Sequence, residues 1–337
     1  MKYLALAGVA AALIFTGCSS KKYFEPEQTF SASKATGSYE SQISSVSRDG
    51  ATLENSRYIS KKEGIRSISL TEGYRFLSEN SRYVLASNIE SSLKVIDKNS
   101  GQVASQISFD SPVVTAAIQG EKIAYILNNN SFGLYSMHAK KKMLEEKADE
   151  TYAIDVRTAT PVFIDSLTVF PMLDGKLIIV NGYDTTNAKV VYLSSADAFN
   201  NVIYLSRTGD TVVAATPKTV ISLGGDGEQE YQANISEVVV SNGMIYLFTK
   251  EGEIIKLNKA MNVVKNTKFK FAHYSVATVI GEKVYALDQK GSLIVLDTSL
   301  NKSKIYDVGE VKRPPFISGT KLYKDGKVIE LSKLGYE

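Results

Sequence analysis

The sequence predicts an all-β protein, namely a β-propeller built from four-stranded blades. Three observations indicate this fold: a pattern recurs about every 40 residues, its apolar runs are rich in Val, Ile, Tyr and Leu, and glycine often separates two runs. These residue types favour strands over helices. A β-rich unit that repeats at this spacing is typical of a propeller blade.

The clearest copies of the repeat align without a gap. GEKVYALDQKGSLIVLD (281–297) lies over NGMIYLFTKEGEIIKLN (242–258), and Gly291 then matches Gly252. Other copies fit the same frame; they occupy residues 120–136, 91–97, 175–181, 218–224 and 321–331. Each copy is expected to be two strands joined by a short turn, with glycine at a corner that needs a positive φ.

The number of copies predicts the number of blades. The last apolar residues of seven copies are Ile96, Tyr135, Val180, Leu223, Leu257, Leu296 and Leu331, at steps of 39, 45, 43, 34, 39 and 35 residues. A fainter copy at residues 55–70 would make eight hairpins. We therefore prefer eight blades, with seven as the alternative.

The two ends of the chain are expected to close the ring. A propeller whose first and last blades share no strand would leave two open sheet edges. Only six residues follow Leu331, too few for the outer strand of the last blade. Residues 38–46, or residues just before them, are predicted to supply that strand, so that deletion of the N-terminal 46 residues should open the ring.

The N-terminus has the layout of a secretory signal peptide. Lys2 precedes an uncharged run that ends at Phe15, and Thr16, Gly17 and Cys18 follow. The run has 13 residues, fewer than the roughly 20 that a spanning helix needs. Cys18 is the only cysteine of 337 residues and cannot form an intramolecular disulfide, which leaves an anchor, a free thiol or an intermolecular bridge.

Residues 15–18, FTGC, resemble a bacterial lipobox in which Phe15 replaces the usual leucine. The resemblance implies cleavage between Gly17 and Cys18, acyl chains such as palmitate on Cys18 and, because Ser19 follows, transport to the outer membrane. The predicted organisation is a signal peptide (1–17), a lipidated flexible tether rich in Ser, Lys, Glu and Thr (18–37) and a propeller domain (38–337).

The blade pattern resembles the PQQ-like propeller repeat. Together with the lipobox and tether, it resembles the BamB-like propeller lipoproteins of the outer-membrane β-barrel assembly (Bam) machinery. This resemblance implies a monomeric, non-catalytic scaffold on the periplasmic face of the outer membrane, in contact with the barrel-assembly machinery or its client proteins. Two alternatives stay open: a propeller that binds a small ligand or polysaccharide, or acts as an enzyme, and a surface lipoprotein that binds a host protein.

The composition argues against several kinds of chemistry. Quinoprotein dehydrogenases of the PQQ-like superfamily use tryptophan to dock blades and stack their cofactor; the chain has no tryptophan, and we expect no cofactor. His138 and His273 are too few for a His-rich metal site, and both are expected to be structural. No catalytic motif is recognised, so no catalytic residue is assigned and the chain is not expected to be an enzyme. The net charge of +3, with Lys and Arg spread along the chain, argues against nucleic acid as a partner.

The longest repeats suggest where partners could bind. HAKKKMLEEKADE (138–150) has helix-favouring residues and is expected to form a solvated loop or a protruding helical turn. Residues 181–201 carry Tyr183 and Phe199, which we assign as candidate partner-contact residues because aromatic side chains beside polar ones are common in interfaces. LGGDGEQE (223–230) is expected to be a tight strand connection rather than a calcium site.

Overall fold

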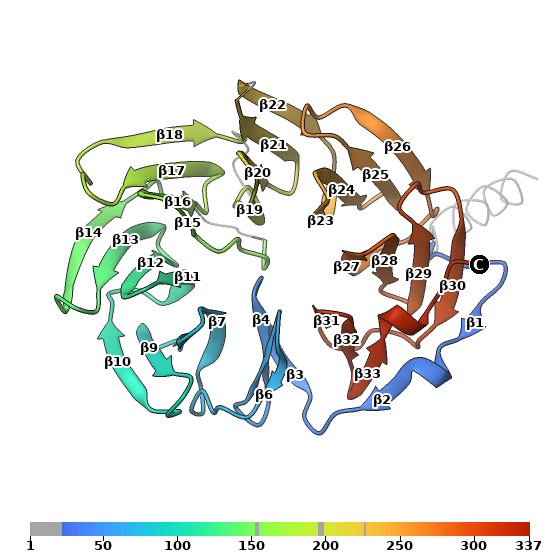
Figure 1. Cartoon of the computed structure of the whole chain (residues 1–337), viewed down its shortest axis with the longest axis horizontal. Coiled ribbons are helices and arrows are strands. Elements are labelled where there is room, and N and C mark those ends of the chain that lie inside the picture. Colours follow the sequence, from blue (N-terminus) through green and yellow to red (C-terminus); the bar gives the residue numbers. More distant parts are fainter. Residues whose placement is uncertain (1–21, 152–154, 195–198, 226) are drawn as a thin grey trace, which may run out of the picture.

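The computed structural model describes residues 22–151, 155–194, 199–225 and 227–337, and within them the strands form eight sheets around a central axis (Figure 1). The eight-bladed all-β propeller predicted from the repeats is confirmed, and the seven-bladed alternative is wrong. Two short 3-10 helices, Ser33–Ala35 and Leu331–Lys333, are the only helices in the described ranges. No helix in this part of the chain is long and apolar enough to cross a membrane. Cys18 and the signal peptide lie outside the described residues.

The first four blades follow one another along the chain. Blade 1 contains β3 (Ile43–Val46), β4 (Gly50–Leu53), β5 (Tyr58–Ser60) and β6 (Gly64–Arg66). Blade 2 contains β7 (Arg75–Glu79), β8 (Tyr83–Ser87), β9 (Ser92–Asp97) and β10 (Val103–Ser108). Blade 3 contains β11 (Val113–Gln119), β12 (Lys122–Leu127), β13 (Ser131–Ser136) and β14 (Lys141–Lys147). Blade 4 contains β15 (Val162–Ile164), β16 (Leu167–Pro171), β17 (Lys176–Asn181) and β18 (Ala188–Tyr192).

The last four blades complete the ring. Blade 5 contains β19 (Tyr204–Thr208), β20 (Thr211–Ala215), β21 (Thr219–Gly224) and β22 (Gly227–Gln232). Blade 6 contains β23 (Ile235–Ser241), β24 (Met244–Thr249), β25 (Glu253–Leu257) and β26 (Val263–Lys268). Blade 7 contains β27 (Tyr274–Ile280), β28 (Lys283–Asp288), β29 (Ser292–Asp297) and β30 (Ser303–Asp307), with β1 (Phe30–Ser31) added at its edge. Blade 8 contains β31 (Phe316–Ser318), β32 (Lys321–Lys324), β33 (Lys327–Glu330) and β2 (Thr36–Ser38).

The hydrophobic core is divided among the contacts between neighbouring blades. In β28, Val284 and Ala286 pack in a cluster shared with blade 6, whereas Tyr285 and Leu287 pack in a cluster shared with blade 8. This alternation follows from the pleat, which points successive side chains to opposite faces of a sheet. Because both faces are covered, the middle strands are continuous apolar runs, and these runs produced the repeat signal in the sequence.

The chain closes the ring with residues from its N-terminal part. β2 pairs antiparallel with β33, Gly37 opposite Val328, and so forms the outer strand of blade 8 (Figure 1). The predicted closure by residues just before 38–46 is confirmed, while β3 within that range is the inner strand of blade 1. β1 pairs parallel with β30, Phe30 opposite Tyr306. Ahead of these strands, Phe24 packs edge-on against Phe269, with ring centroids 5.8 Å apart.

Two predicted boundaries are corrected by these strands. Residues 30–37, assigned to a flexible tether, are instead ordered on blades 7 and 8, because Phe30 and Ala35 pack in the cluster between those blades. Residues 138–150 are neither a loop nor a helical turn throughout: β14 occupies 141–147 as the outer strand of blade 3, paired with β13. Six of its seven side chains are exposed and only Leu144 is partly buried, so its charged composition is that of a sheet edge facing solvent.

The corner glycines take the conformation expected of them. Gly252 and Gly291 have φ values of +81° and +93°, and each lies just before the third strand of its blade. A Cβ at Gly291 would overlap the carbonyl oxygen of Gly309, and one at Gly252 would overlap that of Phe269. Both the backbone angle and the close approach therefore require glycine at these corners.

Candidate functional site

A cavity of about 650 Å³ opens in the middle of the ring. It is formed where inner strands and their turns converge, from blades 1 to 5. Its wall is polar on the side of blades 1 and 2 and partly apolar on the opposite side. The charged residues that line it are Arg48, Asp49, Lys61, Lys62, Glu63, Glu79 and Lys98; the larger apolar residues are Ile118, Pro161, Val162, Phe163 and Leu205. A cavity of this size is large enough for a small organic ligand.

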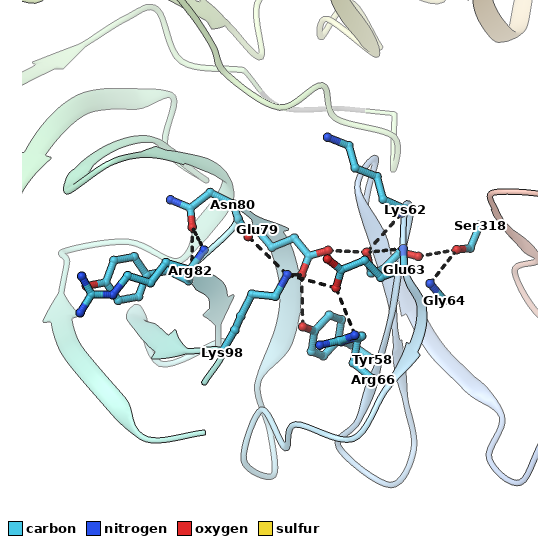
Figure 2. Close-up of polar contacts among 12 residues, drawn as sticks. Tyr58, Lys62, Glu63, Gly64, Arg66, Glu79, Asn80, Arg82, Lys98 and Ser318 are labelled. Carbon is cyan, nitrogen blue, oxygen red and sulfur yellow. Dashed lines mark hydrogen bonds and ion pairs between the residues drawn. The ribbon is translucent and has the colours of Figure 1, made fainter. Parts of the chain in front are cut away.

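A network of paired charges forms the wall on blades 1 and 2 (Figure 2). Lys98, which directly follows β9, has a side chain only 7% exposed, and its Nζ lies 3.0 Å from Glu79 Oε2 and 3.2 Å from Glu63 Oε2. Glu63 also pairs with Arg66 at 3.2 Å. Each buried charge thus has an opposite charge beside it, which offsets the cost of removing both from water.

Glu79 also connects the two blades by hydrogen bonds. Its carboxylate accepts from the hydroxyls of Tyr58, at 3.2 Å, and Ser60, both on β5. Burial, together with the Glu79 charge, holds the pKa of Tyr58 well above its usual range, so the phenol remains a donor at all physiological pH values. The Tyr58 ring stacks on Phe76 of blade 2, with centroids 4.8 Å apart.

Residues 155–161, between β14 and β15, extend toward the central axis (Figure 1). Arg157 pairs with Asp155 and donates to the carbonyl oxygen of Ser236 on β23 of blade 6. Asn201 holds the segment by donating from Nδ2 to the Arg157 carbonyl oxygen at 2.8 Å. Burial alone would raise the pKa of Asp155, but the hydrogen bond and charge of Arg157 outweigh it and lower that pKa. The segment thus links the connection between blades 3 and 4 to blade 6.

The arrangement favours recognition of polar groups. Among the described residues, no group of three or more His, Cys, Asp or Glu side chains could hold a metal ion. Glu63 and Glu79 share Lys98 as a counter-ion. Of the two histidines, His138 is exposed on a turn 3.9 Å from Glu121, and the backbone N–H of His273 donates to Asp288. Neither histidine lines the cavity.

The two predicted contact residues lie on blade 4 but not together. Tyr183 is 87% exposed and Phe199 is 58% exposed. Tyr183 follows the C-terminal end of β17, whereas Phe199 precedes Asn200, which bonds to Asp174 at the other end of that strand. At about 3.3 Å per residue, the strand separates the two ends by roughly 16 Å.

Phe199 instead has neighbours that the sequence did not single out. Tyr192 and Val190 on β18 are also exposed, and the Tyr192 ring lies 5.5 Å from Lys176 Nζ. Asn200 Nδ2 donates to Ser194 O at 3.1 Å and so joins the Phe199 segment to the end of this strand. We call Val190, Tyr192 and Phe199 the blade-4 rim. The available signal was a period of two: Val190 and Tyr192 alternate with Val191, which is buried.

The comparisons with known proteins agree with the fold. No protein-family model matches the chain. The plasminogen-binding protein PgbB of Helicobacter pylori is 28% identical in strain J99 and 27% identical in strain 26695, in each case over 94% of this chain and 66% of the relative. The chain thus spans about two thirds of the length of these curated relatives.

Solved structures with the same fold are much more distant in sequence. BamB from Moraxella catarrhalis is 12% identical with a TM-score of 0.67, covering 87% of this chain and 97% of that one. The C-terminal WD40 domain of Sif2 is also 12% identical, with a TM-score of 0.64 over 88% of this chain and 98% of that one. At such identities the likeness establishes a BamB-like propeller fold and nothing of function.

Proposed function

We propose that this chain is a non-catalytic, protein-binding propeller whose partner is plasminogen. The observation that carries the proposal is the similarity to PgbB, which extends over 94% of this chain. It therefore includes most of the propeller rather than one motif. This partner corresponds to the host-protein alternative drawn from the sequence.

We propose the blade-4 rim as the contact surface. Large apolar and aromatic side chains exposed on the same blade are favourable anchors for a protein partner, because burying them on binding removes apolar surface from water. Tyr192 is 66% exposed and lies beside Lys176, so the surface offers an aromatic ring and a cation together. Tyr183 lies at the opposite end of the blade and serves as a matched control.

Plasminogen binding by the full chain, immobilised through its C-terminus, tests both parts of the proposal. We expect saturable binding, and we expect Tyr192→Ala with Phe199→Ala to weaken it at least tenfold, because one interface hot spot contributes about 2 kcal/mol. Tyr183→Ala should change it less than threefold. No binding at micromolar plasminogen would contradict the partner. Equal weakening by Tyr183→Ala would contradict the surface.

We further propose that Cys18 is lipidated and anchors the chain in the outer membrane. The support is the FTGC sequence and the signal-peptide layout before it. Cys18→Ser should leave an uncleaved or soluble form whose propeller still folds. Retention of the variant in the outer-membrane fraction after a high-salt wash would contradict the anchor.

A second candidate function is assistance in assembling outer-membrane β-barrels on the periplasmic face. The lipobox together with the eight-bladed fold favours it, as the resemblance noted in the sequence implies. Affinity purification after gentle detergent extraction should then recover the large barrel-assembly protein. Recovery of the propeller alone, even after cross-linking, would count against this role.

A further inference from the structure

The N-terminal segment lies against the ring from residue 22 onward. Phe24 contacts Phe269, which lies in the connection between blades 6 and 7, and β1 and β2 pair with the outer strands β30 and β33. Lys22 is four positions after Cys18. An extended chain spans at most about 3.6 Å per residue, so Lys22 lies within about 14 Å of Cys18, whereas a free tether up to residue 37 would allow about 70 Å. If Cys18 carries the acyl chains proposed above, this part of the ring cannot move far from the membrane surface.

Aromatic rings and lysines meet where the segment reaches the ring. The ammonium groups of Lys22 and Lys270 lie 5.6 and 5.1 Å from the centroid of the Phe271 ring. Tyr23 is 40% exposed, and Lys290 Nζ lies 4.4 Å from its ring centroid. We call Lys22, Tyr23, Lys270, Phe271 and Lys290 the anchor corner. Such pairs suit a membrane interface, because the ring can enter the headgroup region while the ammonium group stays at the level of the lipid phosphates.

Two lysines of the anchor corner are free to attract anionic groups. Lys290 pairs with Glu310 at 2.6 Å. In the described part of the chain, Lys22 and Lys270 are both exposed, and neither has a carboxylate partner. Glu25, on the same segment, is exposed and pairs with neither of them. The unpaired charges therefore leave an excess of positive charge, which favours an anionic lipid surface.

The topology of the blades shows which face of the ring carries the anchor corner. Because the strands within each blade alternate in direction, the connections between blades and the turns between second and third strands lie on the same face. Phe271 lies in such a connection and Lys290 in such a turn. Lys140 and Lys141, at the turn between β13 and β14, lie on the opposite face and on blade 3, across the ring from blade 7 (Figure 1). These two lysines provide a matched control.

We propose that the anchor corner contacts anionic lipid headgroups, so that the face with the blade connections is turned toward the membrane at blades 6 and 7. The inference rests on the proposed lipidation of Cys18. A lipid surface is the occupant that the structure favours, because the short distance to Cys18 keeps the corner within reach of the bilayer and the charges are complementary. Coverage of the corner by a protein partner is the competing outcome.

Photo-crosslinking from lipids tests the orientation on the full chain. The protein purified from membranes is placed in vesicles of phosphatidylethanolamine and phosphatidylglycerol that contain a phosphatidylglycerol with a photoactivatable headgroup. We expect peptides with Tyr23 or Phe271 to carry at least fivefold more lipid adducts than peptides with Lys141. Equal yields, or no adducts at the anchor corner, would overturn the proposal and leave the corner to a protein partner. The intact mass reports separately whether Cys18 is acylated, so an unacylated chain would contradict the anchor while the adducts still decide the surface.

Charge reversal assigns the contact to the lysines. Lys22→Glu with Lys270→Glu should lower the adduct yield at Phe271 at least fivefold, because two attractive charges become repulsive. Lys140→Glu with Lys141→Glu should leave that yield within twofold of wild type. The acyl chains hold all variants on the vesicles, so the yields report orientation rather than affinity. An unchanged yield in the Lys22 and Lys270 variant would contradict the role of these lysines. If that variant fails to fold, the wild-type chain still decides, since equal yields in phosphatidylglycerol and pure phosphatidylcholine vesicles would contradict it as well.

Discussion

The edges of the blades differ sharply between two sides of the ring. On blades 7 and 8, residues 22–38 supply two strand pairings, and they bury Ala35 and pack Phe30 against the cluster between those blades. On blade 4, β18 is the outermost strand and leaves Tyr192 and Val190 exposed. A sheet edge is a place where another chain can pair or pack. The chain thus covers one side of its rim with its own N-terminal residues and leaves the blade-4 rim exposed.

Removing residues 22–38 should have the largest effect on the stability of the propeller. Blade 8 would lose its outer strand and blade 7 its added strand, together with two buried alanines and the partly buried Phe24 and Phe30. We expect a loss of about 5 kcal/mol of folding free energy and a fall in melting temperature of roughly 10 °C or more. A chain lacking only residues 22–29 keeps β1 and β2 and should lose much less. Calorimetric scans that give both chains the wild-type melting temperature would contradict the closure.

Corner glycines at equivalent positions of blades 7 and 4 should differ in the stability that is lost when alanine replaces them. Gly291 on blade 7 and Gly175 on blade 4 both have positive φ and precede the third strand. A Cβ at Gly291 would overlap backbone, whereas one at Gly175 would overlap the side-chain amide of Asn200. We expect Gly291→Ala to cost about 2–5 kcal/mol, from strain and overlap together, and Gly175→Ala about 1–2 kcal/mol. Urea titrations of the two variants measure the difference in folding free energy. Equal losses in both variants would show that the Gly309 backbone moves aside as easily as the Asn200 side chain.

Aromatic side chains on the two sides should separate stability from binding. Phe24→Ala removes the edge contact with Phe269 and should cost about 1–2 kcal/mol. Tyr192→Ala removes an exposed ring and should change stability by less than about 0.5 kcal/mol. Melting temperatures measured beside plasminogen binding test this separation. A large stability loss in Tyr192→Ala would mean that the blade-4 rim is structural.

Acid should lower the stability contributed by a carboxylate on blade 8 more than that contributed by one beside blade 4. This is the smallest of the expected effects. Burial alone would raise the pKa of Asp325 on blade 8, but Lys324 and the N–H groups of Lys312 and Arg313 outweigh it and lower that pKa. Its ionised form therefore stabilises the fold above the ordinary pKa of about 3.9, and this contribution disappears as the pH falls through the lowered value.

The matched variants are Asp325→Asn and Asp149→Asn, the latter at an exposed carboxylate paired with Lys176. Asp325→Asn should lower the melting temperature at pH 7, with the difference from wild type shrinking between pH 4 and 2.5. Asp149→Asn should change little at any pH, because solvent and salt screen an exposed pair. A constant Asp325→Asn difference across this range would exclude the titration.

The sequence allowed the blades to be predicted because their middle strands are buried on both faces. Residues such as Ile294 and Leu296 repeat in kind from blade to blade, and the corner glycines keep the register visible. The outer strands were harder to predict. β14, KKMLEEK, faces solvent and carries residues that are common in helices, so only its pairing with β13 determines that it is a strand.

The cavity could not be predicted for a different reason. Arg48 at its wall pairs with Glu237, which is 189 residues away, and no local pattern relates a turn in blade 1 to a strand in blade 6. Glu237 did leave one signal, a charged residue inside the apolar run of β23. The lipid anchor at Cys18 remains a prediction from the sequence.

The pairing of β2 with β33 also sets an order of events in time. Ser38 and its partner Lys327 are almost the whole domain apart in the chain. At about 5–20 residues per second, a ribosome needs roughly 15–60 s between making the first and the second. Throughout that interval the early strand has no native partner. The nascent propeller must therefore wait, with its first and last edges unmatched, until β33 has been made, and any factor that shields strand edges would act in this interval.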